Sequence, residues 1–523
     1  MWDWLRSERQ KYRVPTKRIV LTNHASLTGL DHRGQELFGR ALPRGVLLPR
    51  LKPDRERVNF WMSPGELLRH RFVPGQIMLG KFAGQYLGHM DDRPLVTFAQ
   101  SRSGKTSTVI EPNLYLYPGS TLVLDPKGGI SHLALYRRAL GHQVHILDPF
   151  GQSGEPSSSF NPLSALDPDN LAIVDDVALI ANALVPDDGD PRSRHWNDSA
   201  RKLIIGVILL VLALEPDERN LVTVRELLCL SYPPLVEGAR MVAAREAADE
   251  ATDKRRKNFS ANAQALEFLL RRMKALGPRF GGIAAAIGDR FLNMPEGERG
   301  NIFSTAATHT DFLDSLLLRR TLLRSDFRLD ALRSDRPTTI FLCLPVARVE
   351  PHARWLRLIV QMCCIVLERM GPYPRDRTPI LFLMEEFATL GHMQYMEHAA
   401  AYFPEFGVKL WAILQNLTQL QAHYKTGWET ILGNAGLLQF FANGDGETLR
   451  YIESRLGKLI EPFELHSAFS RERQSQILLM AGMPPAAALR LEHEDVDTIR
   501  RQVLRAARDM THQKPGQFRL PGQ

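Results

Sequence analysis

The sequence predicts an α/β protein in which a doubly wound, mostly parallel sheet carries an inserted all-α domain. Two observations indicate this fold class. Short apolar runs bounded by turn residues alternate with helical patterns in both halves of the chain. Between about residues 170 and 300 this alternation stops, and long helical patterns follow one another without a convincing strand.

Seven apolar runs, rich in Val, Ile, Leu and Phe, are the expected strands. They show no alternation of apolar and polar residues, which is typical of strands covered on both faces of a parallel sheet. Ligands of such a sheet bind at the carboxyl ends of its strands. The runs are Leu95–Ala99, Thr121–Asp125, Val144–Leu147, Thr338–Leu344, Ile380–Met384, Val408–Leu414 and Leu437–Ala442.

The central stretch contains four long segments with helical periodicity, and we expect it to form the all-α insertion. The segments are Leu171–Leu184, Trp196–Leu214, Phe259–Leu276 and Gly282–Leu292. The expected limits are a basic N-terminal arm (1–60), an α/β domain in two parts (61–170 and 301–505), the all-α domain (171–300) and a polar tail (506–523).

The composition is that of an ordinary globular protein, since 44% hydrophobic and 24% charged residues give no reason to expect disorder. The formal net charge is +8, and residues 1–60 hold 13 Lys/Arg against 6 Asp/Glu, a net of +7. This arm could face a phosphate backbone or an anionic membrane. The alternative is a solvated basic arm without a partner.

No segment has the length of a membrane span. The longest apolar run, Leu203–Leu214, has 12 residues, where a helical span takes about 20, so it predicts a core helix. The basic residues near the N-terminus are not followed by an apolar stretch, and no signal peptide is expected. Four cysteines, Cys229, Cys343, Cys363 and Cys364, are expected to be buried thiols, which is consistent with a cytoplasmic protein.

The strand Leu95–Ala99 leads directly into a turn that resembles a phosphate-binding P-loop. Gly104 allows close approach of the backbone, Lys105 supplies positive charge to the β- and γ-phosphates, and the Thr106 hydroxyl ligates Mg²⁺. The alternative is a fortuitous turn. The α/β domain is therefore the predicted nucleotide-binding domain, with ATP and Mg²⁺ as its ligands. The predicted binding residues are Ser101, Arg102, Ser103, Gly104, Lys105, Thr106 and Ser107.

Three further residues are predicted to be catalytic. Glu385 and Glu386 follow the strand Ile380–Met384, and neighbouring residues at an extended strand end point to opposite sides. We expect Glu385 to serve the metal together with Thr106, and Glu386 to orient the attacking water. Gln415, at the end of another strand, could sense the γ-phosphate or place the water. The alternatives are a solvated turn for the acids and a surface position for the glutamine.

Asp125 and Lys127 follow the second strand of the α/β domain, so they should lie at the carboxyl edge of the sheet near the P-loop. Lys127 could contact phosphate or DNA there. A salt bridge between Lys127 and Asp125 is the equally weighted alternative.

Taken in order, these motifs resemble the type IV secretion coupling proteins of the TraG/TraD-like family, P-loop ATPases that deliver DNA and protein substrates to conjugation and secretion channels. The resemblance extends from about Gly75 to about Leu491. It includes segments outside the phosphate site, which makes it specific. The matching segments are Leu79–Leu87, Pro118–Ser120, Leu124–Gly129, Leu147–Phe150, Phe160–Leu163, His195–Asn197, Met384–Ala388 and Gln415–Leu420.

The resemblance implies a RecA-like motor domain with an all-helical domain, assembled as a homo-hexamer around a channel for DNA, or monomeric without DNA. It implies DNA-stimulated ATP hydrolysis. The implied partners are DNA, a relaxase or effector proteins, and type IV secretion channel components. The implied location is cytoplasmic, peripheral to the inner membrane through those partners. An arginine that completes a neighbour's ATP site is also implied, and its candidates are Arg348, Arg354, Arg357 and Arg450.

The sequence departs from the family pattern in three ways. Ala99 stands where a glycine is usual, and Glu385 stands where an aspartate is usual. We also expect no N-terminal membrane anchor of the kind that typical members carry, as in a soluble variant or in a chain from which the anchor has been removed. The first two departures keep open an ATP-binding recruitment adaptor with little or no hydrolysis. An FtsK/HerA-like DNA translocase is the other alternative to the coupling ATPase.

Overall fold

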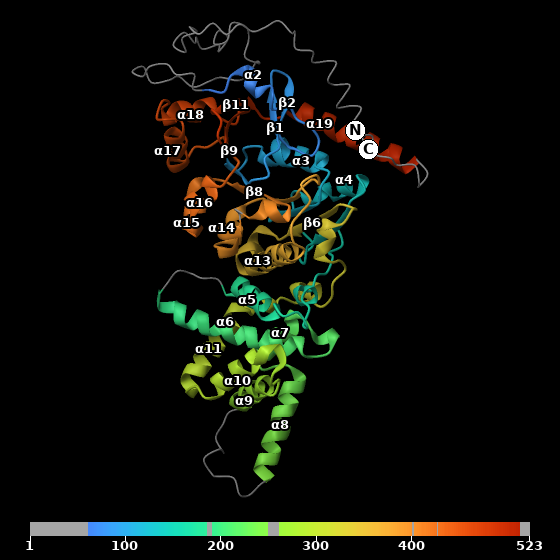
Figure 1. The fold of residues 1–523 in the computed structure, drawn as a ribbon, viewed down its shortest axis with the longest axis vertical. Coiled ribbons are helices and arrows are strands. Elements are labelled where there is room, and N and C mark those ends of the chain that lie inside the picture. Colours follow the sequence, from blue (N-terminus) through green and yellow to red (C-terminus); the bar gives the residue numbers. More distant parts are fainter. Residues whose placement is uncertain (1–60, 186–190, 249–260, 400–401, 426, 513–523) are drawn as a thin grey trace.

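The structure, a computed structural model, describes residues 61–185, 191–248, 261–399, 402–425 and 427–512. The predicted basic arm therefore lies outside the described residues. In Figure 1 a large sheet with its covering helices forms the upper part of the molecule, and a helical region forms the lower part.

One eleven-stranded sheet contains all seven predicted strands. The order β9-β3-β8-β7-β4-β6-β5 is parallel throughout, which confirms the mostly parallel α/β fold. The strands are β1 Ile77–Phe82, β2 Gln85–His89, β3 Leu95–Ala99, β4 Thr121–Asp125, β5 Gln143–Leu147, β6 Thr338–Cys343, β7 Ile380–Met384, β8 Val408–Leu414, β9 Leu437–Phe441, β10 Ser475–Met480 and β11 Ala486–Leu489.

Both faces of the parallel part are covered, which explains its unbroken apolar runs. Along β3, Val96 and Phe98 belong to one hydrophobic core, while Leu95 and Ala99 belong to the other. The helices of the first core include α5 Ile173–Leu184, α13 Val346–Arg369, α15 Leu417–Tyr424, α16 Trp428–Gly433, α17 Gly446–Arg455 and α18 Pro462–Ala468; those of the second include α3 Glu111–Leu116, α4 Ala134–Ala139 and α19 His493–His512.

Four antiparallel strands extend the sheet beyond β9 in the order β10-β11-β1-β2 and were not among the predicted strands. The apolar run Ile477–Met480 of β10 is comparable to those of the other seven and was missed. β1 and β2 contain Gly80 and Gly88, where an added Cβ would lie 2.1 Å from the Leu489 carbonyl oxygen and 2.0 Å from Gln76 Oε1. Close packing at these points requires glycine and removes the usual strand signal.

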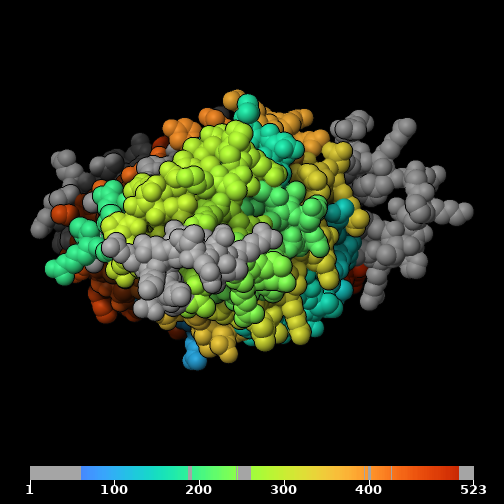
Figure 2. Space-filling view, turned by 90° about the horizontal axis from the view of Figure 1, so that it is seen from below, coloured from blue at the N-terminus to red at the C-terminus, as the bar shows by residue number. Residues whose placement is uncertain are grey.

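The helical region lies between β5 and β6, and the described part of it contains no strand. Its longest helix, α6, has a largely buried carboxyl-terminal half, which includes all but the last two residues of the apolar run Leu203–Leu214 that was expected to be a core helix. The expected boundary at residue 300 falls inside α11, which packs against α6. The helices are α6 Pro191–Leu212, α7 Leu221–Leu228, α8 Pro233–Ala248, α9 Ala261–Lys274, α10 Ile283–Leu292, α11 Glu296–His309 and α12 Leu316–Leu322. Seen from below, this region projects in front of the sheet part (Figure 2).

The structure can also be compared with three smaller expectations. Cys343, Cys363 and Cys364 are buried as predicted, but Cys229 is exposed because it follows the last turn of α7. Residues 506–512, expected in the polar tail, form the end of α19, whose buried Val496, Ile499 and Val503 continue a helical pattern. In the described parts of the chain, the helices are too short or too polar to cross a membrane.

The chain crosses between the sheet part and the helical region twice, and the two crossings lie side by side. The amide of Phe160 donates to the carbonyl oxygen of Thr321 at 2.7 Å, and that of Asp326 donates to Ser159 at 2.9 Å. The rings of Phe160 and Phe327 stack with centroids 5.4 Å apart. These contacts fix the base of the helical region against the sheet part.

Candidate nucleotide-binding site

The predicted phosphate loop connects β3 to a helix at the carboxyl edge of the sheet. The Ser103 amide donates to the Gln100 carbonyl oxygen at 3.2 Å, which closes a tight turn. Left-handed backbone occurs at Arg102, with φ of 59°, and at Gly104, with φ of 88°. Ala99 is the last residue of β3 and needs no glycine conformation, so its departure from the usual motif does not strain this loop.

Both predicted acids contact the phosphate loop. Lys105 Nζ lies 2.9 Å from Glu386 Oε1, and the Thr106 hydroxyl donates to Glu385 Oε1 at 3.5 Å. The expectation that the two side chains point to opposite sides is wrong. The strand ends at Met384, and a left-handed turn at Glu386, with φ of 54° and ψ of 49°, brings both carboxylates to the same site.

Glu386 is the centre of a buried polar network. Its Oε2 accepts a hydrogen bond from Gln415 Nε2 at 2.9 Å, and Lys127 Nζ lies 2.7 Å from Oε1. The structure thus places Gln415 beside Glu386, and its catalytic role stays a prediction. Gln419 turns back to accept from the Gln415 amide at 2.9 Å and so fixes the start of α15.

Lys127 binds Glu386, whereas sequence reasoning paired it with phosphate, DNA or Asp125. Asp125 is fully buried and accepts hydrogen bonds from the amides of Gly129, Ile130 and Ser131, at 3.0, 2.8 and 2.8 Å. Its carboxylate therefore holds the loop that carries Lys127. The sequence predicted only that Lys127 lies at the carboxyl edge of the sheet near the phosphate loop. Its pairing with Glu386 depends on the left-handed turn at Glu386, which the sequence did not predict.

The two glutamates have opposite pKa shifts. Burial raises the pKa of Glu385 to about 7, with the Asp125 charge adding to the effect and Lys105 opposing it. Burial also disfavours the charged form of Glu386, but the Lys105 charge and hydrogen bonds from Lys127, Lys105 and Gln415 outweigh it and lower the pKa of Glu386 to about 2. Glu386 is thus a carboxylate at neutral pH, while Glu385 exchanges a proton near neutrality.

The remaining predicted binding residues differ in their surroundings. Ser101 and Arg102 are exposed at the turn, and the Ser107 hydroxyl donates to the Gly104 carbonyl oxygen at 3.3 Å. Ser103 Oγ is buried, and no hydrogen-bond partner is found for it in the described part of the chain. A buried hydroxyl without a partner, a nearby lysine and a helix amino terminus form a donor set that fits phosphate oxygens. Thr106 and Glu385 supply oxygen atoms that fit Mg²⁺.

The four candidates for a neighbour-completing arginine each have a contact within the chain. Arg348 lies over the Phe150 ring, Arg354 pairs with Asp311 at 3.6 Å, Arg357 donates to the Leu390 carbonyl oxygen at 3.4 Å, and Arg450 pairs with Glu447. Their role toward a neighbouring copy stays a prediction.

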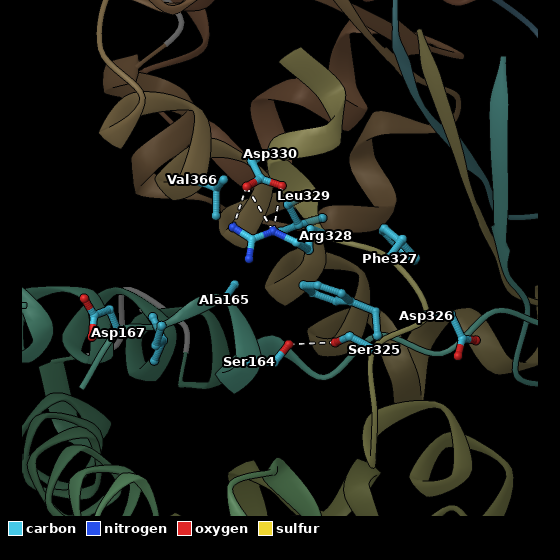
Figure 3. Close-up of a pocket in the computed structure, with 12 residues that line it drawn as sticks. Ser164, Ala165, Asp167, Ser325, Asp326, Phe327, Arg328, Leu329, Asp330 and Val366 are labelled. Carbon is cyan, nitrogen blue, oxygen red and sulfur yellow. Dashed lines mark hydrogen bonds and ion pairs between the residues drawn. The ribbon is translucent and has the colours of Figure 1, made fainter. Parts of the chain in front are cut away.

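A cavity of about 500 Å³ lies elsewhere, at the base of the helical region (Figure 3). Arg328 and Asp330 form an ion pair at 2.6 Å on its wall, and the hydroxyls of Ser164 and Ser325 lie 2.6 Å apart. These polar groups satisfy one another, and the cavity contains no residue of the phosphate loop. It is a feature of the two crossings and separate from the nucleotide site.

The central parallel strand, its phosphate loop and the carboxylate pair two strands away define the P-loop NTPase fold. The chain belongs to the type IV secretory system conjugative DNA transfer family, whose model matches residues 64–477. This membership confirms the resemblance to coupling proteins.

Curated relatives show the same family at low identity. The chain is 25% identical over 391 residues to the conjugal transfer protein TraG of Escherichia coli, covering 72% of this chain and 57% of the relative. It is 24% identical over 471 residues to protein VirD4 of Rhizobium radiobacter, covering 84% and 63%. The chain thus matches less than two thirds of each relative's length.

Solved structures of the plasmid coupling protein TrwB share the fold. The unbound form superimposes with a TM-score of 0.61 at 15% identity, covering 86% of this chain and 96% of that one. The form in complex with ADP and Mg²⁺ gives a TM-score of 0.58 at 15% identity, covering 82% and 93%.

Proposed function

We propose that this protein is an ATP-hydrolysing coupling protein that recruits DNA or relaxosome and effector proteins and drives them to a type IV secretion channel. The observation that carries the proposal is the buried network in which Glu386 contacts Lys105 of the phosphate loop, Lys127 and Gln415. A loop that binds phosphate is thereby joined to a carboxylate and an amide suited to position water.

In this proposal the phosphate loop binds ATP through its backbone amides, the Lys105 ammonium and the Ser103 hydroxyl. Thr106 and Glu385 would hold Mg²⁺, which supplies neutralisation of phosphate charge. Glu386 stays ionised because of its low pKa, and its carboxylate orients the attacking water. Gln415 holds the Glu386 carboxylate in place by its hydrogen bond.

The test is ATP turnover by the purified protein with and without DNA. We expect DNA to stimulate hydrolysis, Lys105→Ala to abolish nucleotide binding and turnover, and Glu386→Gln to retain binding but lose turnover. Lys274→Ala and Asp289→Asn are matched controls, because these residues form an ion pair at 2.6 Å in the helical region. Turnover by the DNA-bound wild type that does not exceed that of the two site variants would contradict the proposal.

A second candidate function is an ATP-binding adaptor that recruits substrates without hydrolysis. It is favoured by the raised pKa of Glu385, which leaves this carboxyl partly protonated at neutral pH and weakens it as a metal ligand. Calorimetric titration that shows ATP binding, with no phosphate release in the presence of DNA and partner proteins, would select the adaptor. No observation in the structure favours the FtsK/HerA-like translocase over these two.

The assembly and partners belong to the same proposal. We propose a homo-hexamer around DNA that contacts channel components at the inner membrane; membership of a conjugative DNA transfer family supports the association with DNA and a secretion system. Light scattering of the protein, first alone and then with ATP and DNA, tests the hexamer. A particle that stays monomeric after ATP and DNA are added would contradict it.

A further inference from the structure

Arg490 lies buried behind the phosphate loop, immediately after β11. Its Nη1 donates to the Ser103 carbonyl oxygen at 2.6 Å and to the Thr108 hydroxyl at 3.4 Å, and its Nη2 donates to the Arg471 carbonyl oxygen at 3.3 Å. The guanidinium stands 4.4 Å from the centroid of the Phe441 ring. Arg490 is 0% exposed, so these contacts make up its surroundings.

The charge of Arg490 is not balanced by a carboxylate in the described part of the chain. Each of its hydrogen-bond acceptors is a neutral oxygen, and its Nε is buried without a partner. Burial lowers the pKa of Arg490 to about 10, so the group stays charged at neutral pH. A buried cation is costly unless an anion lies nearby. The neighbouring phosphate loop is the element whose hydrogen-bond donors fit an anion.

The hydrogen bond to Ser103 also sets the direction of one loop amide. The carbonyl and N–H groups of a trans peptide point in opposite directions. Because Arg490 holds the Ser103 carbonyl oxygen on the buried side, the Gly104 N–H points away from the interior. Gly104 adopts φ of 88°, and an added Cβ there would lie only 3.3 Å from Arg490 Nη1. The absence of a side chain at this position therefore leaves space for the guanidinium.

The position of Arg490 is fixed from both sides along the chain. Its amide donates to the Gln474 carbonyl oxygen at 2.7 Å, which continues the β10–β11 pairing. Just beyond it, Lys81 Nζ binds Glu492 at 3.1 Å and Asp495 at 2.8 Å, at the start of α19. The guanidinium is therefore held against the loop by the antiparallel part of the sheet.

We propose that Arg490 is a positioning residue of the nucleotide site, which orients the Ser103–Gly104 peptide and adds positive charge behind the bound phosphates. This inference rests on the proposed binding of ATP by this loop. It gives the antiparallel strands a function, because they carry the residue that shapes the loop.

Arg490→Met and Arg490→Lys test the role, with Arg137→Met as the matched control. Arg137 is also 0% exposed and donates to neutral groups only, among them the carbonyl oxygens of Leu114, Tyr117 and Gly119. Both methionine variants should lower the melting temperature, since each leaves buried carbonyl groups unpaired. Only Arg490→Met should weaken binding of a fluorescent ATP analogue and of ADP, by about tenfold or more, as expected for a lost charge-assisted contact. Arg490→Lys should restore part of the affinity.

Hydrogen exchange provides a readout without nucleotide. Amides 101–106 should exchange faster in Arg490→Met than in Arg137→Met. Wild-type affinity in folded Arg490→Met, or an equal affinity loss in both methionine variants, would overturn the inference. A wild type that binds neither nucleotide would contradict the proposed function instead, while unchanged loop exchange in Arg490→Met would still overturn the role of Arg490.

Discussion

Glu386 illustrates how a single backbone conformation determines the chemistry of the site. Its left-handed φ and ψ cost a non-glycine residue about 1–3 kcal/mol. The contacts with Lys105, Lys127 and Gln415 hold it in this conformation. An extended residue would have carried the Glu386 side chain to the other side of the strand from Glu385. The turn therefore allows two adjacent acids to serve one phosphate loop.

Glu385 predicts a dependence of metal binding on pH. A carboxyl must lose its proton to ligate Mg²⁺, and the pKa of Glu385 is about 7. We expect the Mg²⁺ concentration at half-maximal ATP turnover to fall severalfold as the pH rises from about 6 to about 8. The same titration of Glu385→Gln shows how much of the change comes from the nucleotide's own protonation. Equal Mg²⁺ requirements of the wild type at both pH values would argue against Glu385 as a ligand.

Alanine variants of Gln415 and Gln419 distinguish a role of Gln415 in catalysis from a role in the structure at the start of α15. Gln415→Ala removes the hydrogen bond to Glu386 and should lower kcat about tenfold or more with little change in KM. Gln419→Ala removes only the bond to the Gln415 amide and should have a smaller effect on kcat. Steady-state ATPase assays measure both, and equal losses in kcat would assign the effect to the start of α15.

At the scale of elements, the strands differ in how clearly their sequences predict them. Six of the seven parallel strands are buried along their whole length, and their apolar runs predicted them. The seventh, β5, lies at the edge of the sheet and is only partly buried at Gln143, Val144 and His145. Among the four antiparallel strands, glycine interrupts β1 and β2, and alanine makes up most of β11, while the apolar run Ile477–Met480 of β10 was missed. Arg490 was not predicted for a different reason: its contact with the phosphate loop joins segments that are distant in the sequence.

Close packing of α9 against α10 predicts a specific sensitivity in the helical region. An added Cβ at Gly288 would lie 2.7 Å from the Leu270 carbonyl oxygen and 2.9 Å from the Lys274 amide, which are backbone atoms that cannot rotate away. Gly288→Ala should therefore lower the free energy of unfolding by about 1–3 kcal/mol.

The control for this change is Gly300→Ala in α11, where an added Cβ meets nothing within 4 Å. There alanine should stabilise the helix by up to about 1 kcal/mol. Denaturant unfolding of the two variants compares the effects directly. A Gly288→Ala protein as stable as Gly300→Ala would show that α9 and α10 separate readily.

At the scale of the whole molecule, the fold class and the approximate place of the helical insertion followed from periodicity alone. The positions of the candidate site residues at one sheet edge followed from their place after strands. The pairing of Lys127 with Glu386 and that of Arg490 with the loop could not be predicted from periodicity. The first joins residues 259 positions apart in the sequence, and the second joins residues 387 positions apart. Such contacts are set by strand order, which periodicity does not specify.

The side-by-side crossings at Phe160–Thr321 and Ser159–Asp326 have an evolutionary consequence. A region that leaves and re-enters a fold at one place can be exchanged as a cassette, because its replacement leaves the strand order and the nucleotide site unchanged. A change in the length or sequence of the helical region can thus leave the geometry of the phosphate loop and its carboxylates intact.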